Sequence, residues 1–313
     1  MALGSNIEFI HRVREFGERV LGLDFAGSFE RFDSSLGKAN WLYASPVHRI
    51  ESALKEKNRV VPFRFSWERE RLEPERQDCL SRGLDTYLFS AEAHGAGDCP
   101  ITGELLRSEK VRQCYVVLHE GWHSTLRKEG IQLPYMIEEA TGRVVGNFGA
   151  IIFAKREEDP LLLARASEQE RDWSRFTDYI NDCYKRLAEV YEKVAEEFRR
   201  ERKKSGESGS RSILTEKILQ ARKPHLKRAN KQARELASTM LTLWETKELE
   251  NTVNNAFILR YYSYTRYYAF AVKTLRDAGG LAVACARFKG VEVAPRQAGR
   301  KLVFSNTGAR ESR

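Results

Sequence analysis

The first hundred residues alternate between two kinds of hydrophobic pattern. Apolar residues recur every three or four positions from Ile7 to Leu21 and predict a helix that ends at Gly22. A second helix is predicted over residues 67–82, with Gly83 after its last turn. Runs rich in aromatic and branched residues, bounded by Gly and Pro, predict strands over residues 41–44, 60–65 and 86–90. This part of the chain is therefore expected to hold a small sheet.

From residue 102 onward the apolar pattern is helical almost to the end of the chain. It predicts helices over residues 102–127, 135–153, 166–204, 212–249 and 251–277, with a Ser/Gly break at residues 205–210. Together the patterns predict an α-rich α+β fold with a small N-terminal sheet and long C-terminal helices. We expect one domain over residues 1–290 and a disordered tail over residues 291–313. The expected parts of that domain are a mixed α/β part (1–100), a pair of helices (101–165) and a helical part (166–290).

Basic residues are concentrated in one segment. The chain has 313 residues and a net charge of +9, and residues 199–231 contain 12 Lys and Arg against 3 Glu, so the rest of the chain is neutral. Surfaces that bind nucleic acid usually interleave basic and aromatic residues, whereas this segment has Ser and Gly and no aromatic residue. The pattern therefore argues against a nucleic-acid partner, and we expect a flexible basic segment near residues 200–230.

The sequence also bears on the location of the chain. No apolar run reaches the roughly 18 residues of a membrane span. Charged residues come early, from Glu8 onward, so no secretory signal is visible, and whether a leader has been removed is left open. The five cysteines are odd in number and form no CxxC pair, which argues against a disulfide framework or a cysteine zinc site. These features predict a cytoplasmic protein.

Residues 119–123 read His-Glu-Gly-Trp-His and form an HExxH motif. On a helix, His119 and His123 lie on one face about 6 Å apart along the axis, so both imidazoles can bind one zinc ion. Glu120 lies about 100° around the helix, where its carboxylate can take a proton from a metal-activated water. The alternative is a pair of surface histidines beside a solvated glutamate. The uncharged run at residues 114–118 argues against that alternative, because it indicates a buried helix.

A third ligand is expected on the next helix. Gly130 can end the motif helix, and Pro134 suits the first turn of the helix that follows. Glu139 is the predicted ligand and Glu138 the alternative, since adjacent helical positions point about 100° apart and only one can easily face the metal. Both could instead be ordinary N-terminal acids stabilised by the helix dipole.

Polar residues near the C-terminus are candidates for contacts with substrate. Asn254, Ile258, Tyr261, Tyr264 (or Thr265) and Tyr268 recur at three or four positions, which predicts one helix face. Aromatic packing explains most of these tyrosines, and Tyr264 is the candidate that donates a hydrogen bond to the oxyanion of the reaction. For the amides of Asn254 and Asn255, the partner could be substrate, a ligand residue or backbone.

Four further residues have two interpretations each. Asp98 and Glu138 are candidates to bind the α-amine of an exopeptidase substrate, although Asp98 can also cap the helix that starts near residue 102. Asp85 could orient a metal-binding imidazole or shape the turn after Gly83. His94 could contact substrate or lie exposed in its loop.

Several segments together resemble a known family. They are the HExxH motif, the segment Glu139-Ala-Thr-Gly-Arg-Val-Val145, the segment Arg82-Gly-Leu-Asp-Thr-Tyr-Leu88 with the loop to Asp98-Cys-Pro100, and Asn254-Asn-Ala-Phe-Ile258 with the later Gly279-Gly280. Over residues 25–290 the chain resembles the bacterial predicted-aminopeptidase family of gluzincin-like zinc metallopeptidases. The resemblance implies a zincin-like pair of helices, one bearing HExxH and one bearing Glu139, and one Zn²⁺ per chain.

These observations predict a zinc-dependent metallohydrolase, an aminopeptidase-like peptidase or amidase that acts on a peptide or small amide with Glu120 as general base. One alternative is a helical metal-binding or acidic-partner-binding protein without hydrolase activity, which would use residues 199–231. Another is an iron enzyme that uses the same two histidines and carboxylate for oxidation, in which Glu120 would have no task. The substrate and the oligomeric state are left open.

Overall fold

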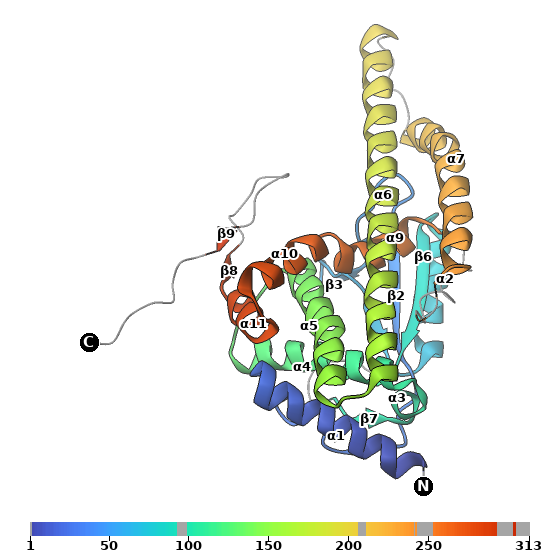
Figure 1. Cartoon of the computed structure of the whole chain (residues 1–313). Coiled ribbons are helices and arrows are strands. Elements are labelled where there is room, and N and C mark those ends of the chain that lie inside the picture. Colours follow the sequence, from blue (N-terminus) through green and yellow to red (C-terminus); the bar gives the residue numbers. More distant parts are fainter. Residues whose placement is uncertain are drawn as a thin grey trace. The chain divides into compact units, whose positions relative to one another are not determined.

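The computed structural model describes residues 2–92, 99–205, 211–240, 242, 253–292 and 303–304 (Figure 1). The chain divides into two compact units. The first unit comprises residues 1–37, 92–170 and 266–313, and the second comprises residues 38–91 and 171–265. The single domain over residues 1–290 stays a prediction.

The first unit is a cluster of helices built around α4 and α5. Its elements are α1 (Ala2–Leu21), β1 (Phe32–Asp33), β7 (Ile101–Thr102), α3 (Gly103–Arg107), α4 (Lys110–Lys128), α5 (Tyr135–Arg156), α10 (Tyr268–Ala278), α11 (Leu281–Lys289), β8 (Val291–Glu292) and β9 (Val303–Phe304). β1 pairs with β7 in parallel, and β8 pairs with β9 antiparallel. Helix α1 buries Ile10 and Val13, and its Phe9 and Phe16 meet the ring of Phe153 on α5 edge-on.

Glycines allow close packing against α4 and α5. A Cβ at Gly146 of α5 would lie 2.6 Å from the ring of Tyr115 on α4, and one at Gly149 would lie 2.6 Å from the side chain of Leu118. Contacts this short exclude a larger residue unless the neighbour moves. Trp122 of α4 is fully buried and donates a hydrogen bond of 3.0 Å from Nε1 to Oγ1 of Thr141 on α5. The two helices are therefore held in close contact with a defined register.

The second unit contains an antiparallel sheet with helices. Its elements are β2 (Ala39–Ser45), β3 (Lys55–Glu56), β4 (Arg59–Val60), β5 (Arg64–Ser66), the 3₁₀ helix η1 (Arg69–Arg71), α2 (Glu73–Ser81), β6 (Asp85–Ala91), α7 (Arg211–Ala237) and α9 (Asn255–Thr265). Strand β2 lies between β5 and β6, and Trp41 of β2 is opposite Phe65 of β5 and Phe89 of β6. Tyr87 of β6 packs edge-on against Phe257 of α9. The long helix α6 (Pro160–Ser205) has its first eleven residues in the first unit and the rest in the second.

Three predicted elements are each split in two. The helix predicted over residues 102–127 is α3 and α4, because the backbone is extended at Ser108 and Glu109. The strand predicted over residues 60–65 is β4 and β5, which flank Pro62; proline has no N–H to donate to a sheet. The helix predicted over residues 67–82 is η1 and α2, and Pro74 lies in the first turn of α2.

The helix predicted over residues 251–277 is also wrong as a single element. Helix α9 ends at Thr265 and α10 begins at Tyr268. No Gly or Pro marks this break; instead Asn181 of α6 donates a hydrogen bond to the carbonyl oxygen of Thr265 and accepts one from its hydroxyl. Tyr268 is therefore on a different helix from Tyr261 and Tyr264, and the predicted common face does not extend to it.

The predicted fold class is confirmed: the described chain is mainly helical, with a small sheet in its N-terminal part and long helices toward the C-terminus (Figure 1). The described part of the basic segment forms the end of α6 and most of α7. Of the helices in the described residues, none combines the length and the apolar character needed to span a membrane. The tail predicted over residues 291–313 lies outside the described residues apart from β8 and β9.

Candidate metal centre

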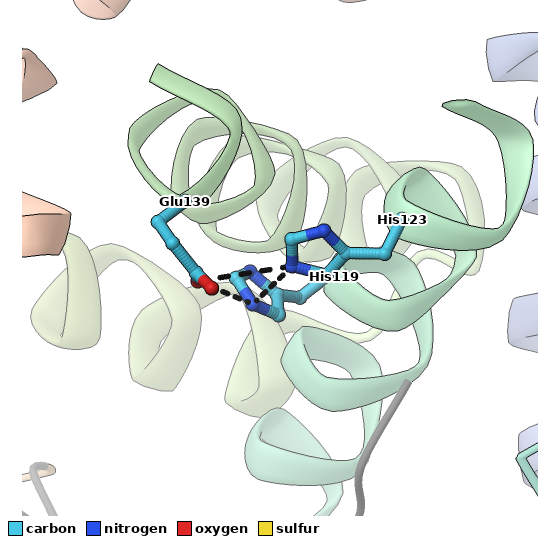
Figure 2. Close-up of side chains that lie close together, drawn as sticks. All are labelled: His119, His123 and Glu139. Carbon is cyan, nitrogen blue, oxygen red and sulfur yellow. Dashed lines mark hydrogen bonds and ion pairs between the residues drawn. The ribbon is translucent and has the colours of Figure 1, made fainter. Parts of the chain in front are cut away.

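Three side chains from α4 and α5 converge in the first unit. His119 and His123 come from α4 and Glu139 comes from α5, and all three are buried. The Nε2 atoms of the two histidines are 3.2 Å apart. Oε2 of Glu139 lies 3.6 Å from Nε2 of His119 and 3.7 Å from Nε2 of His123 (Figure 2). Three potential ligand atoms thus face a common point.

These separations fit a metal ion of the expected kind. Ligand atoms about 2.0–2.1 Å from a tetrahedral zinc ion are roughly 3.3 Å from one another. The three separations in the chain, 3.2, 3.6 and 3.7 Å, are close to that value. Two imidazoles and one carboxylate also leave one tetrahedral position for water, as catalytic zinc sites do. The buried group formed by His119, His123 and Glu139 can therefore hold a metal ion.

The outer nitrogen of each imidazole has a partner of its own. Nδ1 of His123 lies 2.7 Å from Oε1 of Glu138, so a proton on Nδ1 is donated to the carboxylate. Nδ1 of His119 lies 3.3 Å from the hydroxyl of Tyr115, one helical turn earlier on α4. The carboxylate of Glu138 holds a proton of His123 on Nδ1, which leaves Nε2 of the neutral ring for a metal, and both contacts hold the orientation of their rings. Glu138 therefore contacts the outer side of His123, whereas Glu139 faces both Nε2 atoms.

The groups that surround His123 change its pKa. Burial, the largest single influence, lowers the pKa of His123. The hydrogen bond to Glu138 and then the charges of Glu139 and Glu120 outweigh burial and raise the pKa from 6.5 to about 9. In the metal-free chain His123 is therefore protonated at neutral pH, and its positive charge compensates the neighbouring carboxylates.

The local sequence explains how Glu139 reaches the histidines. Helix α4 ends at Lys128 and Gly130 follows in the left-handed region with φ +68°, where glycine is favoured. Pro134 then precedes α5, and its carbonyl accepts hydrogen bonds from the backbone N–H groups of Ile137 and Glu138. A Cβ at Gly142 would lie 3.0 Å from Nδ1 of His119, so this glycine leaves room for the imidazole against α5.

Glu120 differs from the residues around it on α4. It is partly exposed, whereas His119 and Gly121 on either side of it are buried. No hydrogen bond or ion pair of Glu120 is present within the described part of the chain, although its charge raises the pKa of His123. Its carboxylate is therefore close to the metal ligands and is not occupied by another described side chain.

Asn254 and Asn255 are at the start of α9 in the second unit, where both amides contact backbone. Asn254 caps the helix: its Oδ1 accepts from the N–H of Phe257 at 2.9 Å, and its Nδ2 donates to the carbonyl of Thr86. The Asn255 side chain is fully buried, donates to the carbonyl of Pro46 at 2.9 Å and accepts from the hydroxyl of Tyr191 at 2.7 Å. These contacts favour the backbone alternative for both amides.

Tyr264 is on α9 in the second unit and is partly exposed. Its ring meets that of Trp173 at a centroid distance of 6.5 Å, and the guanidinium of Arg260 lies 4.2 Å from its centroid. The role of Tyr264 as a hydrogen-bond donor in the reaction stays a prediction.

Asp85 is at the beginning of β6, and its carboxylate does not bind an imidazole within the described residues. Its two oxygens accept hydrogen bonds from Arg222 of α7 at 2.7 and 3.2 Å, and Oδ2 also accepts from the backbone N–H of Asn255. Asp98 and His94 lie outside the described residues. Cys114 is fully buried, and burial raises the pKa of its thiol, in agreement with a core position.

Tyr115 is the residue near the ligands that sequence reasoning missed. It lies four residues before His119 and therefore on the same face of α4. The i, i+4 spacing alone could have predicted a contact between the two side chains. The uncharged run at residues 114–118 indicates a buried helix, and burial alone does not distinguish a core tyrosine from one that contacts a metal ligand.

The fold and this group of side chains define the class of site: two histidines of an HExxH helix and a glutamate of the next helix, buried together and able to hold a metal ion. The family model described as "Putative aminopeptidase" matches residues 1–297. The chain therefore belongs to this family, which confirms the resemblance to a predicted-aminopeptidase family. No curated protein and no solved structure matches the chain.

Proposed function

We propose that the chain is a zinc-dependent hydrolase of peptide or small amide bonds, an aminopeptidase-like peptidase or amidase. The observation that carries this proposal is the convergence of Nε2 of His119, Nε2 of His123 and Oε2 of Glu139 within 3.2–3.7 Å of one another. Membership of an aminopeptidase family supports a peptidase, and the donor set supports zinc.

His119, His123 and Glu139 would hold the ion. Zinc, when bound, lowers the pKa of water toward about 7 and polarises the scissile carbonyl. The two imidazoles bind as neutral groups, and Glu138 orients that of His123 through its Nδ1–H. Burial of the three ligands excludes bulk water from their lone pairs, which strengthens their interaction with a cation.

Glu120 would be the general base. It accepts the proton of the attacking water and then passes that proton to the nitrogen of the leaving amine. Its partly exposed carboxylate has no described partner that must first be displaced. An iron oxidase built on the same ligands would leave Glu120 without a task, which is why we favour hydrolysis.

Substrate contacts are proposed with different degrees of structural support. Tyr264 as an oxyanion donor and Asp98 as a ligand of the substrate amine remain proposals from the sequence. For Asn254 and Asn255 we propose a structural role at the start of α9 in place of direct contact with substrate. All five cysteines are buried free thiols, which supports the expected reducing, cytoplasmic setting.

The substitution Glu120→Gln tests the proposal. It should retain about one zinc per chain while hydrolysis of a panel of aminoacyl-p-nitroanilides and short peptides falls by about 10²–10⁴-fold, the usual contribution of a general base. Glu109→Gln is a matched control, because Glu109 is exposed at the start of the same helix and its side chain makes no capping bond. Zinc content is measured by atomic emission and hydrolysis by release of nitroaniline or free amine. Full hydrolysis by the Glu120→Gln protein would remove Glu120 as the base, and a wild-type chain that binds no zinc would overturn the whole proposal.

A further inference from the structure

The two histidines of the candidate metal centre have outer partners of different chemistry. His123 donates its Nδ1–H to the carboxylate of Glu138. Nδ1 of His119 faces the phenol hydroxyl of Tyr115 at 3.3 Å, and both residues are on α4. The HExxH motif and the helix-borne glutamate account for the ligands, but neither accounts for a tyrosine at this position.

The ring of Tyr115 is fixed on several sides by side chains of the first unit. It stacks on the imidazole of His119 with a centroid distance of 5.3 Å and an interplanar angle of 26°. The guanidinium of Arg143 on α5 lies 4.3 Å from the ring centroid, and that of Arg112 on α4 lies 5.0 Å from it. Gly146 of α5 is against the ring edge, where a Cβ would lie 2.6 Å away.

These supports are themselves held in place. Arg112 and Arg143 are both buried, and Arg112 forms an ion pair of 2.8 Å with Glu92. Tyr115 is only 4% exposed, so its ring cannot turn into solvent without breaking the packing of α4 against α5. The hydroxyl is therefore presented to His119 by a rigid ring.

We infer that Tyr115 is a positioning residue for His119. Its hydroxyl accepts the Nδ1–H of His119, which places the proton on Nδ1 and leaves the Nε2 lone pair facing His123 and Glu139. In the opposite tautomer Nδ1 would accept from the phenol and Nε2 would carry the proton, so His119 could not bind a metal. The inference rests on the proposed function, because it assigns Tyr115 to the metal centre of that hydrolase.

The variant Tyr115→Phe isolates the hydroxyl, because it keeps the aromatic ring and its contacts with the two guanidiniums. Loss of an outer partner typically weakens metal binding by about 10–100-fold, so the dissociation constant of zinc should rise by that factor. The cobalt(II)-substituted protein should show an altered d–d absorption band, since the imidazole of His119 is less firmly oriented. The melting temperature of the metal-free chain should fall by less than about 4 °C, as expected for one lost hydrogen bond.

Tyr268→Phe is the matched control. Tyr268 belongs to the same unit and is buried, and its hydroxyl accepts a hydrogen bond from Asn147 and donates one to Glu170. This variant should therefore lose a similar amount of stability with unchanged zinc affinity and cobalt spectrum. Zinc affinity is measured in the full chain by competition with a chromophoric chelator.

The outcomes separate this inference from the proposed function. If wild type binds zinc and the Tyr115→Phe protein binds it within twofold with the same cobalt spectrum, the inference is wrong and the proposed function stands. If Tyr268→Phe weakens zinc as much as Tyr115→Phe does, the role of Tyr115 is merely structural. If the wild-type chain binds neither zinc nor cobalt, the proposed function itself fails.

Discussion

Two polar clusters, one in each unit, contrast in how their polar atoms are used. In the first unit, Nε2 of His119, Nε2 of His123 and Oε2 of Glu139 face one another at 3.2–3.7 Å. In the second unit, the amides of Asn254 and Asn255 bond to the carbonyls of Thr86 and Pro46. Both clusters are chemically plausible as sites when only the sequence is considered. They differ in whether neighbouring backbone satisfies the polar groups.

The difference is energetic. An amide that bonds to a backbone carbonyl compensates its own burial and needs no ligand. In the first unit, the Nε2 lone pairs of His119 and His123 and the carboxylate of Glu139 face one another in a buried site. This arrangement is unfavourable unless a positive charge lies among them. In the metal-free chain the proton on His123 supplies that charge, and a bound cation would replace it. A group of facing acceptors is therefore a stronger indication of a site than a group of saturated amides.

The largest expected effect follows from removal of a ligand. His119→Ala should raise the dissociation constant of zinc by more than about 100-fold, because loss of a direct ligand exceeds the 10–100-fold cost of losing an outer partner. Competition with a chromophoric chelator measures it. The matched control in the second unit is Asn254→Asp, which should bind zinc like wild type. If the dissociation constant of zinc for His119→Ala is within tenfold of the wild-type value, the first cluster is not a metal site and the two clusters do not differ as argued.

The second expected effect is a dependence of zinc affinity on pH. The metal binds neutral His123, whereas the metal-free chain holds a proton there up to about pH 9, so binding releases one proton. The dissociation constant should rise toward tenfold per pH unit below pH 9, or about 50-fold from pH 9 to pH 7. The measurement is a chelator competition repeated across that range.

The same proton affects the stability of the metal-free chain. Since the pKa of His123 is raised above 6.5, its stabilising contribution is complete below about pH 6.5 and is lost as the pH rises through about 9. The melting temperature of the metal-free chain should therefore fall between these values. Glu138→Gln replaces the charged acceptor of the hydrogen bond that raises the pKa of His123 most by a neutral amide oxygen, so both pH dependences should shift to lower pH. Zinc affinity that is constant from pH 7 to pH 9 would contradict this account of the cluster.

Much of the candidate metal centre could be predicted because its geometry is local. The spacing of His119 and His123 fixes their common helix face, and Gly130 and Pro134 mark the turn that returns the chain to them. The sequence left Glu138 and Glu139 as alternatives, because a one-residue difference in where α5 begins exchanges which of them faces α4. The roles of Glu138 and Tyr115 toward the outer nitrogens depend on packing between two helices and could not be settled from spacing.

The prediction was weaker wherever a break in a helix is caused by distant residues. Pro62 and Pro74 are visible in the sequence, and the kind of element near each of them is predicted correctly, although each predicted element is split in two. The end of α9 at Thr265 is different, since it is satisfied by Asn181, 84 residues earlier in the chain. Helix periodicity gives no information about such a contact. The sequence therefore predicts that Tyr268 shares a helix face with Tyr261 and Tyr264, which it does not.

The smallest expected effect concerns the second cluster and tests whether it is structural. Asn255→Ala leaves the carbonyl of Pro46 and the hydroxyl of Tyr191 without their buried partner, which should lower the free energy of unfolding by about 2 kcal/mol. Asn254→Asp keeps the helix cap to Phe257 but replaces the donor to the carbonyl of Thr86 by an acceptor oxygen, so it should cost about 1 kcal/mol. Urea denaturation followed by circular dichroism measures both. If Asn255→Ala instead keeps wild-type stability and loses hydrolysis, the amide acts on substrate, and saturation by backbone would not distinguish structural amides from functional ones.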